Sequence, residues 1–359
     1  MKFSCSSGTI SVTTSAMTDL TTFLKQRPTP YSGIAVIADK TVFNLYGKEL
    51  MELLKGLKLP AFESIIEPGE SSKSLSTVES CWNAMRDHGL DRSSLVIGFG
   101  GGVVTDIAGF AASSYMRGID LVHIPTSLLA MADASIGGKN GVNLTSGKNI
   151  VGSIYQPRQV IISLDYLTTL PTKELSAGLA EVIKCGVIGD PSLFEYLEQN
   201  IADILCLDKE KLTSIVQSTA TFKASIVNSD EKEKNLRAIL NYGHTFGHAI
   251  ESASNYAITH GEAVSIGMCC AANASHLLGM VDAAFIKRQN AICLKAGLPT
   301  VLPASLDNDK LIDLMYGDKK ATKGKISLIL VEGLGKVKQV DSVKTDIIRE
   351  AFQAARQAP

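Results

Sequence analysis

Three histidines lie close together in two short segments of the chain. The segments read NYGHTFGHAIES and NYAITHGEAV, and they contain His244, His248 and His260. His244 and His248 are four residues apart, so they share one face if the segment is helical. The spacing is similar to H-E-x-x-H, but Thr245 follows the first histidine, so the general base of a metalloprotease is absent. His260 precedes Gly261, where we expect a loop to enter a helix.

A carboxylate upstream could complete a metal site with these histidines. In AGLAEVIKCG, Glu181 and Lys184 are three residues apart and share a helical face. Burying Glu181 beside Val182 and Ile183 costs free energy unless the carboxylate is paired or binds a cation. Two histidines and one carboxylate could hold a divalent ion with positions open for substrate. Structural histidines and a salt-bridged glutamate are the alternatives, and the residue types alone leave them open.

A glycine-rich turn, GFGGGVVTD (98–106), follows an apolar segment and leads into the helix-like IAGFAASS. Glycines let the backbone approach a phosphate, and a helix N-terminus favours its charge. The match to G-x-G-x-x-G is imperfect, because Val103 stands at the final glycine position. A tight turn without a ligand is the alternative interpretation.

Two Gly-Lys-Asn units follow, at 138–140 and 147–149. Glycine allows close approach, lysine supplies a point charge, and asparagine offers both a donor and an acceptor. Solvated surface charge is the alternative, and it suits Lys323 and Lys325 better than Lys139 and Lys148, which lie in glycine-rich turns. No P-loop motif is present. The other basic residues that could serve an anion site are Arg117, Lys223 and Arg237.

The elements that must position these residues differ between the two halves of the chain. Short β-branched runs alternate with helical patterns in the first half, which predicts a mostly parallel sheet with ligands beyond the carboxyl ends of its strands. The predicted strands are 33–39, 63–69, 94–102, 120–127 and 159–165, and the predicted helices are 41–56 and 73–89.

Long helical patterns dominate from about residue 172, which predicts a second, largely helical domain. Leu170–Pro171 marks the boundary, and we assign residues 1–168 and 169–359 to the two domains. The predicted helices are 172–189, 191–204, 208–228, 234–254, 260–279 and 283–295, and the one predicted strand pair is 325–332 with 335–341.

Composition excludes several classes of protein. The chain has 359 residues, 45% of them apolar, and its net charge of −1 gives no reason to expect nucleic acid or a membrane surface as a partner. The seven cysteines form no even framework, which favours buried free thiols in a reducing compartment. The first 20 residues lack the apolar core of a signal peptide, and the apolar stretch 263–281 contains polar residues typical of a buried helix. We therefore expect a cytoplasmic protein.

Several segments together resemble 3-dehydroquinate synthases, a family of sugar-phosphate cyclases. The order and the spacing of the blocks agree with that family over roughly residues 68 to 264. The matching blocks are PGESSKS (68–74), GGGVVTDIAGFAASSYMRG (100–118), PTSLLAMADASIGGKNGVN (125–143), GKNIVGSIYQP (147–157), LTTLPTKELSAGLAEVIK (167–184), LRAILNYGHTFGHAIE (236–251) and HGEAV (260–264), with DKK (318–320) later.

The resemblance implies a fold and a set of site residues. The fold is an α/β N-terminal Rossmann-like NAD domain followed by a mostly α-helical C-terminal domain, and the metal, zinc or cobalt, is held by Glu181, His244 and His260. NAD contacts are implied at Asp39, Glu70, Lys73, Gly101, Gly102, Asp106, Thr126, Ser127, Lys139, Lys148 and Thr169. Substrate and proton-transfer groups are implied at Arg117, Asp133, Lys139, Asn149, Lys184, Lys223, Arg237, Asn241 and His248, with one of Lys319 or Lys320.

The resemblance also implies a reaction. A carbon–oxygen lyase of the shikimate pathway, which leads to chorismate and the aromatic amino acids, converts 3-deoxy-D-arabino-heptulosonate 7-phosphate to 3-dehydroquinate. NAD⁺ oxidises a hydroxyl transiently, phosphate leaves, the ketone is reduced, and ring opening with aldol closure follows. A homodimer is expected from the family. The departures are small: Asn140 stands where the family commonly has threonine, and residues 233–235 replace a glycine-bearing turn.

Three other interpretations stay open. Another cyclase, such as a 2-deoxy-scyllo-inosose or epi-valiolone synthase, would share the metal and NAD residues, although Lys223, Arg237 and Asn241 suit a substrate with a carboxylate. A metal-dependent polyol dehydrogenase would share the architecture but has no use for the phosphate-directed lysines. A catalytically inactive binding protein is the third interpretation.

Overall fold

The computed structural model describes residues 1–357 except 7, 145–146, 232, 234–235 and 318–325. The chain divides into two compact units. The first consists of Met1–Leu170 with Lys223–Lys232, and the second of Pro171–Phe222 with Glu233–Pro359. Lys223–Lys232 therefore belong to the first unit, whereas the predicted domain boundary placed them in the second domain.

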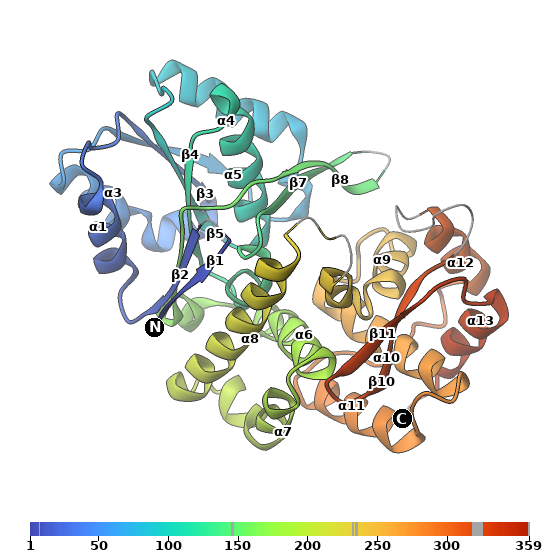
Figure 1. The fold of residues 1–359 in the computed structure, drawn as a ribbon. Coiled ribbons are helices and arrows are strands. Elements are labelled where there is room, and N and C mark those ends of the chain that lie inside the picture. The colour runs from blue at the N-terminus through green and yellow to red at the C-terminus, as the bar shows by residue number, and fades with distance from the viewer. Residues whose placement is uncertain (7, 145–146, 232, 234–235, 318–325, 358–359) are drawn as a thin grey trace. The chain divides into compact units, whose positions relative to one another are not determined.

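The first unit is built on a seven-stranded sheet with strand order β1-β2-β9-β6-β5-β3-β4 (Figure 1). Only β1 and β2 pair antiparallel, and the five predicted strands are confirmed as β3, β4, β5, β6 and β9. The sequence did not indicate β1 or β2. The bounds are β1 (Lys2–Cys5), β2 (Gly8–Thr13), β3 (Ile34–Asp39), β4 (Ala61–Ile66), β5 (Leu95–Gly100), β6 (Asp120–Pro125) and β9 (Gln159–Ser163).

Burial explains which strands take the centre of this sheet. Nearly every residue of β3, β5 and β9 is buried, as a parallel strand covered on both faces requires. Burial alternates along the edge strand β4. The helices of this unit are α1 (Ala16–Gln26), α2 (Lys40–Val42), the π-turn η1 (Phe43–Gly47), α3 (Lys48–Gly56), α4 (Leu75–Asp87) and α5 (Gly102–Ser114), with short 3₁₀ turns η2 (Glu70–Ser72), η3 (Tyr115–Arg117) and η5 (Leu164–Thr169).

A hairpin stands where the sequence predicted only turns. The π-turn η4 (Ala130–Ala134) precedes β7 (Lys139–Leu144) and β8 (Gly147–Ile154), which pair antiparallel as a separate sheet (Figure 1). Each Gly-Lys-Asn unit therefore lies at the start of a strand. The buried amide of Asn140 donates to the carbonyls of Gly138 (2.8 Å) and Tyr155 (3.1 Å), so the departure from threonine serves the hairpin.

The second unit is mostly helical, as predicted, with one hairpin. Its central helix α10 buries almost every residue from Gly261 to Ser275. The elements are α6 (Thr172–Ile188), α7 (Pro191–Leu205), α8 (Lys209–Ser229), η6 (Leu236–Asn241), α9 (His244–Ala253), α10 (His260–Leu277), α11 (Ala283–Lys295), α12 (Asn308–Gly317), β10 (Leu328–Gly333), β11 (Lys336–Val340) and α13 (Thr345–Ala354). The residues of α8 from Lys223 onward belong to the first unit.

The prediction of one helix over 234–254 is wrong. Gly243 has φ +77°, a left-handed conformation that ends η6 and lets α9 begin at His244. A Cβ at this position would also lie 2.8 Å from the backbone nitrogen of Met268 on α10. The break therefore makes His244 the first residue of a new helix.

All seven cysteines are free thiols, and six of them are buried, while Cys206 is exposed. In the described part of the chain, no helix combines the length and the apolar character that crossing a bilayer requires.

Candidate active site

Glu181, His244 and His260 meet in the second unit. Glu181 Oε1 lies 3.5 Å from His244 Nε2 and 3.6 Å from His260 Nε2. The carboxylate comes from α6, and the imidazoles come from the first residues of α9 and α10. Glu181 is wholly buried, and its Oε1 has no hydrogen-bond partner. One carboxylate and two imidazoles, all of which can bind a metal ion, therefore converge at Glu181 Oε1, an atom without a hydrogen-bond partner.

A capping box places His260 at the first residue of α10. The Thr259 backbone N–H donates to Glu262 (2.8 Å), and the Thr259 side chain accepts from the N3 backbone. Lys173 pairs with the same glutamate at 3.2 Å. These contacts satisfy backbone groups at the helix start and confirm the prediction that a loop enters a helix at His260.

The electrostatics of the cluster suit a cation. Burial alone would raise the pKa of Glu181, but Lys184 and His244 outweigh it and hold that pKa well below its usual range. Burial, with Lys184, holds the pKa of His244 well below its ordinary value. For His260 burial also lowers the pKa, but Glu181 and Glu251 outweigh it and raise the pKa to about 10. A site that stabilises positive charge on His260 also suits a divalent ion.

Each imidazole has an acceptor beside its other nitrogen. His244 Nδ1 lies 3.2 Å from the carbonyl oxygen of Tyr242, and His260 Nδ1 lies 3.5 Å from Glu251 Oε2. Glu251 is 2% exposed. It was not among the predicted site residues, although it ends the block LRAILNYGHTFGHAIE, and its signal was a charged residue beside Ala249 and Ile250.

The other predicted residues of the second unit surround these ligands or lie in the preceding turn. Lys184 is buried and pairs with Glu181. The ring of His248 lies 5.6 Å from that of His244. Arg237 is 1% exposed on η6, and Asn241 Nδ2 donates to Glu233 Oε1 at 2.9 Å. Glu233 was noted only as part of a departure from the family, yet its carboxylate holds the Asn241 amide.

In the first unit, the glycine turn lies where the strand order reverses. The chain passes from β3 to the edge strand β4 and then returns to β5 on the other side of β3. Such a reversal is where ligands bind in open parallel sheets. Asp39 ends β3 and accepts from Val42 N at 3.0 Å, while Gly101 precedes α5 with no side chain capping the helix. The uncapped N–H groups can meet a phosphate.

Other predicted NAD residues follow β6, lie in this turn or end η5. Thr126 N donates to the Gly100 carbonyl at 3.0 Å, which ties the end of β6 to that of β5. A Cβ on Gly101 would lie 3.4 Å from Ser127 Oγ, and one on Gly102 would lie 3.3 Å from Ala134 Cβ. Thr169 Oγ1 lies 2.7 Å from Tyr46 Oη.

Asn143 joins several predicted residues, although the sequence did not single it out. Its side-chain amide donates to Glu70 (2.8 Å), its backbone N–H donates to the Lys73 carbonyl (2.8 Å), and its Oδ1 accepts from Asn149 N (3.0 Å). Lys148 lies 3.6 Å from the same oxygen of Glu70. Asn143 thus connects η2 to both strands of the β7–β8 hairpin.

Two buried ion pairs complete this set. Lys73 pairs with Asp106 on α5, and burial raises the pKa of Asp106 while Lys73 opposes that rise. Lys223 Nζ donates to both the side chain and the carbonyl of Asp133, each at 2.6 Å. Lys223 was predicted to bind the substrate, and its two hydrogen bonds to Asp133 orient its ammonium group.

The side chains of Arg117 and Lys139 are exposed. Arg117 has φ +69° in a turn after α5. Lys319 and Lys320 lie outside the described residues.

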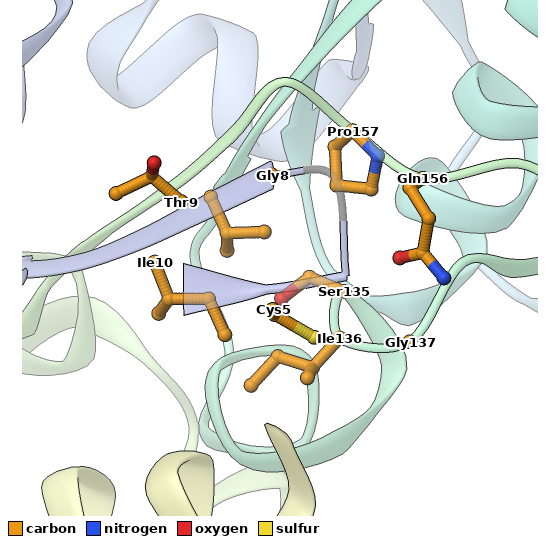
Figure 2. A pocket seen from close by; sticks show the side chains of 10 residues that line it. Cys5, Gly8, Thr9, Ile10, Ser135, Ile136, Gly137, Gln156 and Pro157 are labelled. Carbon is orange, nitrogen blue, oxygen red and sulfur yellow. The ribbon is translucent and has the colours of Figure 1, made fainter. Parts of the chain in front are cut away.

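Two pockets of the described chain are lined by other residues. Figure 2 shows one in the first unit, among Cys5, Ser135 and Gln156. Its volume is about 10 Å³, so it admits at most a single water. The other, about 690 Å³, is an open groove along α3 and β4. None of the lining residues is a predicted site residue.

Comparison with known proteins decides the family. Residues 63–177 match the 3-dehydroquinate synthase N-terminal family, and residues 178–321 match the 3-dehydroquinate synthase C-terminal family. The chain is 43% identical over 323 residues to a 3-dehydroquinate synthase of Nostoc punctiforme, which covers 89% of each chain. The chain belongs to the 3-dehydroquinate synthase family.

Two solved cyclases share the whole fold. A 2-epi-5-epi-valiolone synthase from Streptomyces hygroscopicus with NAD⁺ and Zn²⁺ bound is 29% identical, with TM-score 0.89 and 96% of each chain covered. A 2-deoxy-scyllo-inosose synthase complexed with carbaglucose-6-phosphate, NAD⁺ and Co²⁺ is 27% identical, with TM-score 0.84 and 97% of each chain covered. The expected architecture, an α/β domain with a helical domain, is confirmed.

The residues of this 3-dehydroquinate synthase family member fit both cofactors. A buried carboxylate oxygen without a hydrogen-bond partner, facing two Nε2 atoms, is the donor set that Zn²⁺ and Co²⁺ accept. The uncapped α5 N-terminus at the strand reversal fits the pyrophosphate of a dinucleotide.

Proposed function

We propose that this chain converts 3-deoxy-D-arabino-heptulosonate 7-phosphate to 3-dehydroquinate and phosphate, using NAD and a divalent metal ion. The observation that carries the proposal is Glu181 Oε1 facing His244 Nε2 and His260 Nε2, in a chain 43% identical to a 3-dehydroquinate synthase over 89% of its length. That identity exceeds the 29% and 27% found with the two other cyclases, which favours dehydroquinate synthase among the alternatives.

Glu181, His244 and His260 would hold Zn²⁺ or Co²⁺, which supplies Lewis acidity for a hydroxyl and for the ketone formed from it. Lys184 contacts Glu181, and its ammonium keeps the carboxylate ionised for this role. The first unit would hold NAD at the strand reversal, and the bound cofactor would supply reversible hydride transfer. Its contacts would be Asp39, Glu70, Lys73, Gly101, Gly102, Asp106, Thr126, Ser127, Lys139, Lys148 and Thr169.

The basic residues divide by what they would bind. Arg117, Lys139 and Asn149 would hold the leaving phosphate, since a guanidinium, an ammonium and an amide are all donors. Lys223, Arg237 and Asn241 would hold the substrate carboxylate and hydroxyls. Asp133 and Glu233 support this assignment because they hold Lys223 and Asn241 in place before substrate arrives.

Proton transfer would need orientation more than a strong protein base. The departing phosphate can take the neighbouring proton within one molecule once its donors hold it in place. His248, whose ring lies 5.6 Å from that of His244, is positioned to hold or pass a proton near the reacting hydroxyl. The first 168 residues would carry NAD binding and the rest the metal and most substrate groups. We further expect a cytoplasmic homodimer.

Phosphate release tests the proposal. The enzyme is mixed with the heptulosonate phosphate, with and without NAD⁺ and a chelator, while absorbance at the NADH wavelength is followed. Release that needs both cofactors, with no accumulation of NADH, supports internal recycling of the hydride. Stoichiometric NADH without phosphate would instead support a polyol dehydrogenase. If neither phosphate nor NADH is formed, other sugar phosphates should be assayed as substrates.

A further inference from the structure

The imidazole of His260 lies between two buried carboxylates. Its Nε2 is 3.6 Å from Glu181 Oε1, and its Nδ1 is 3.5 Å from Glu251 Oε2. Glu181 is wholly buried and Glu251 is 2% exposed. We propose that Glu251 is a positioning residue, which holds the His260 ring so that Nε2 is the metal-binding atom.

The assignment of the ring nitrogens follows from the second histidine. Glu181 Oε1 is also 3.5 Å from His244 Nε2, so the Nε2 atoms of both rings converge on the same carboxylate oxygen. The Nδ1 atoms face acceptors instead, the Tyr242 carbonyl for His244 and Glu251 for His260. A neutral imidazole whose Nδ1 carries the proton leaves its Nε2 lone pair for the metal.

The charge of Glu251 adds to its geometry. A metal draws electron density from the ring, and a carboxylate beside Nδ1–H stabilises the charge that develops there. A carbonyl, as beside His244, provides an acceptor but no charge. Glu251 is therefore expected to strengthen His260 as a ligand beyond the effect of an amide in its place.

The position of Glu251 on α9 supports this role. It follows His244 by seven residues and His248 by three, so all three share one stripe of the helix. A carboxylate in that buried stripe costs free energy unless a partner compensates. The His260 imidazole on α10 is one such partner, and the contact ties α9 to the first residue of α10.

Metal affinity tests this inference, which rests on the metal site of the proposed function. The metal-free protein is titrated at fixed pH with Zn²⁺ against a competing chromophoric chelator, and separately with Co²⁺ while its visible absorption is recorded. Glu251→Gln keeps the size of the side chain and removes its charge. We expect its affinity to fall about 10- to 100-fold, the usual cost of losing such a partner, with an altered Co²⁺ spectrum. Glu251→Asp should recover part of the loss.

Two variants separate the possible outcomes. Glu195→Gln changes an exposed carboxylate on α7 that pairs with Arg288, and its metal affinity should stay within about twofold of the parent. Wild-type affinity in Glu251→Gln, or an equal loss in Glu195→Gln, would overturn the inference. His244→Ala tests the site itself. If it retains the metal, the proposed metal site fails; if it loses the metal while Glu251→Gln does not, only the role of Glu251 fails. If Glu251→Gln does not fold, Glu251→Asp is measured in its place. An altered Co²⁺ spectrum would support the role of Glu251, and a spectrum like that of the parent would overturn it.

Discussion

A Cβ placed on Gly261 would lie 2.4 Å from both the Cα and the carbonyl oxygen of Ala177. Gly261 follows the ligand His260, and Ala177 precedes the ligand Glu181 by one helical turn. The backbones of α6 and α10 therefore approach as closely as glycine allows at the point where two ligands must converge. Backbone atoms cannot move aside as the end of a flexible side chain can, so this approach sets how near His260 comes to Glu181.

Gly261→Ala should force α10 away from α6. Overpacking of this kind costs about 1–3 kcal/mol of unfolding free energy, and Zn²⁺ affinity should fall at the same time because the ligands separate. Denaturant unfolding and chelator competition measure the two effects. Gly56→Ala, in a helix where an added Cβ meets nothing within 4 Å, is the control and should lower neither. Parent-like metal affinity in Gly261→Ala would show that the close approach does not position His260.

Arg117→Ala tests the phosphate assignment. A charge-assisted hydrogen bond to phosphate contributes roughly 1.5–3 kcal/mol, so its loss should lower kcat/KM about 10- to 100-fold. Phosphate release from the heptulosonate phosphate is the assay, and thermal unfolding should not change because the side chain is exposed. Arg92→Ala, which removes another exposed arginine of the first unit, should leave kcat/KM as it was. An unchanged kcat/KM in Arg117→Ala would remove that residue from the phosphate site.

Lys73→Met tests the buried pair with Asp106. The side chains are 7% and 18% exposed, so the variant leaves a carboxylate mostly buried without its partner. We expect a loss of roughly 3 kcal/mol in unfolding free energy at neutral pH. The loss should shrink in acid, where Asp106 takes up a proton. Lys48→Met, which breaks a pair that is 89% and 68% exposed, should cost less than about 1 kcal/mol. Equal losses in the two variants would contradict the assignment.

His123 should make the protein sensitive to acid. Burial lowers its pKa from 6.5 to about 3, and its Nδ1 has no hydrogen-bond partner. A depressed folded-state pKa gives stability that is present above pH 6.5 and is lost as the pH falls toward 3. Between pH 6.5 and 4 the loss is roughly 3 kcal/mol.

Unfolding free energies of His123→Gln, measured across this range, should fall less steeply with acid than those of the parent. His88→Gln, which changes an exposed histidine, should keep the parent slope. Parallel curves for His123→Gln and the parent would show that His123 is not the group responsible.

The predicted strands and most predicted helices could be read from local pattern because burial imposes it locally. A central parallel strand such as β3 must be apolar at nearly every position, and an amphipathic helix repeats its apolar face. The metal ligands were visible for a similar reason, since a charged residue in an apolar helix, like Glu181, needs a partner. The family resemblance then indicated which histidines to pair with it.

What only the tertiary structure decided depends on contacts between distant segments. Periodicity continued through Gly243, but its left-handed backbone splits the predicted helix, because α10 packs against that point. Asn143 is held by partners up to 73 positions away in the chain, and no local sequence pattern encodes such contacts. The sequence by itself determined the alternating and helical halves and the types of the ligands. The packing of α6, α9 and α10 decided their distances and gave Glu251 its contact, because backbone approach at Gly261 is a property of two helices rather than of either one.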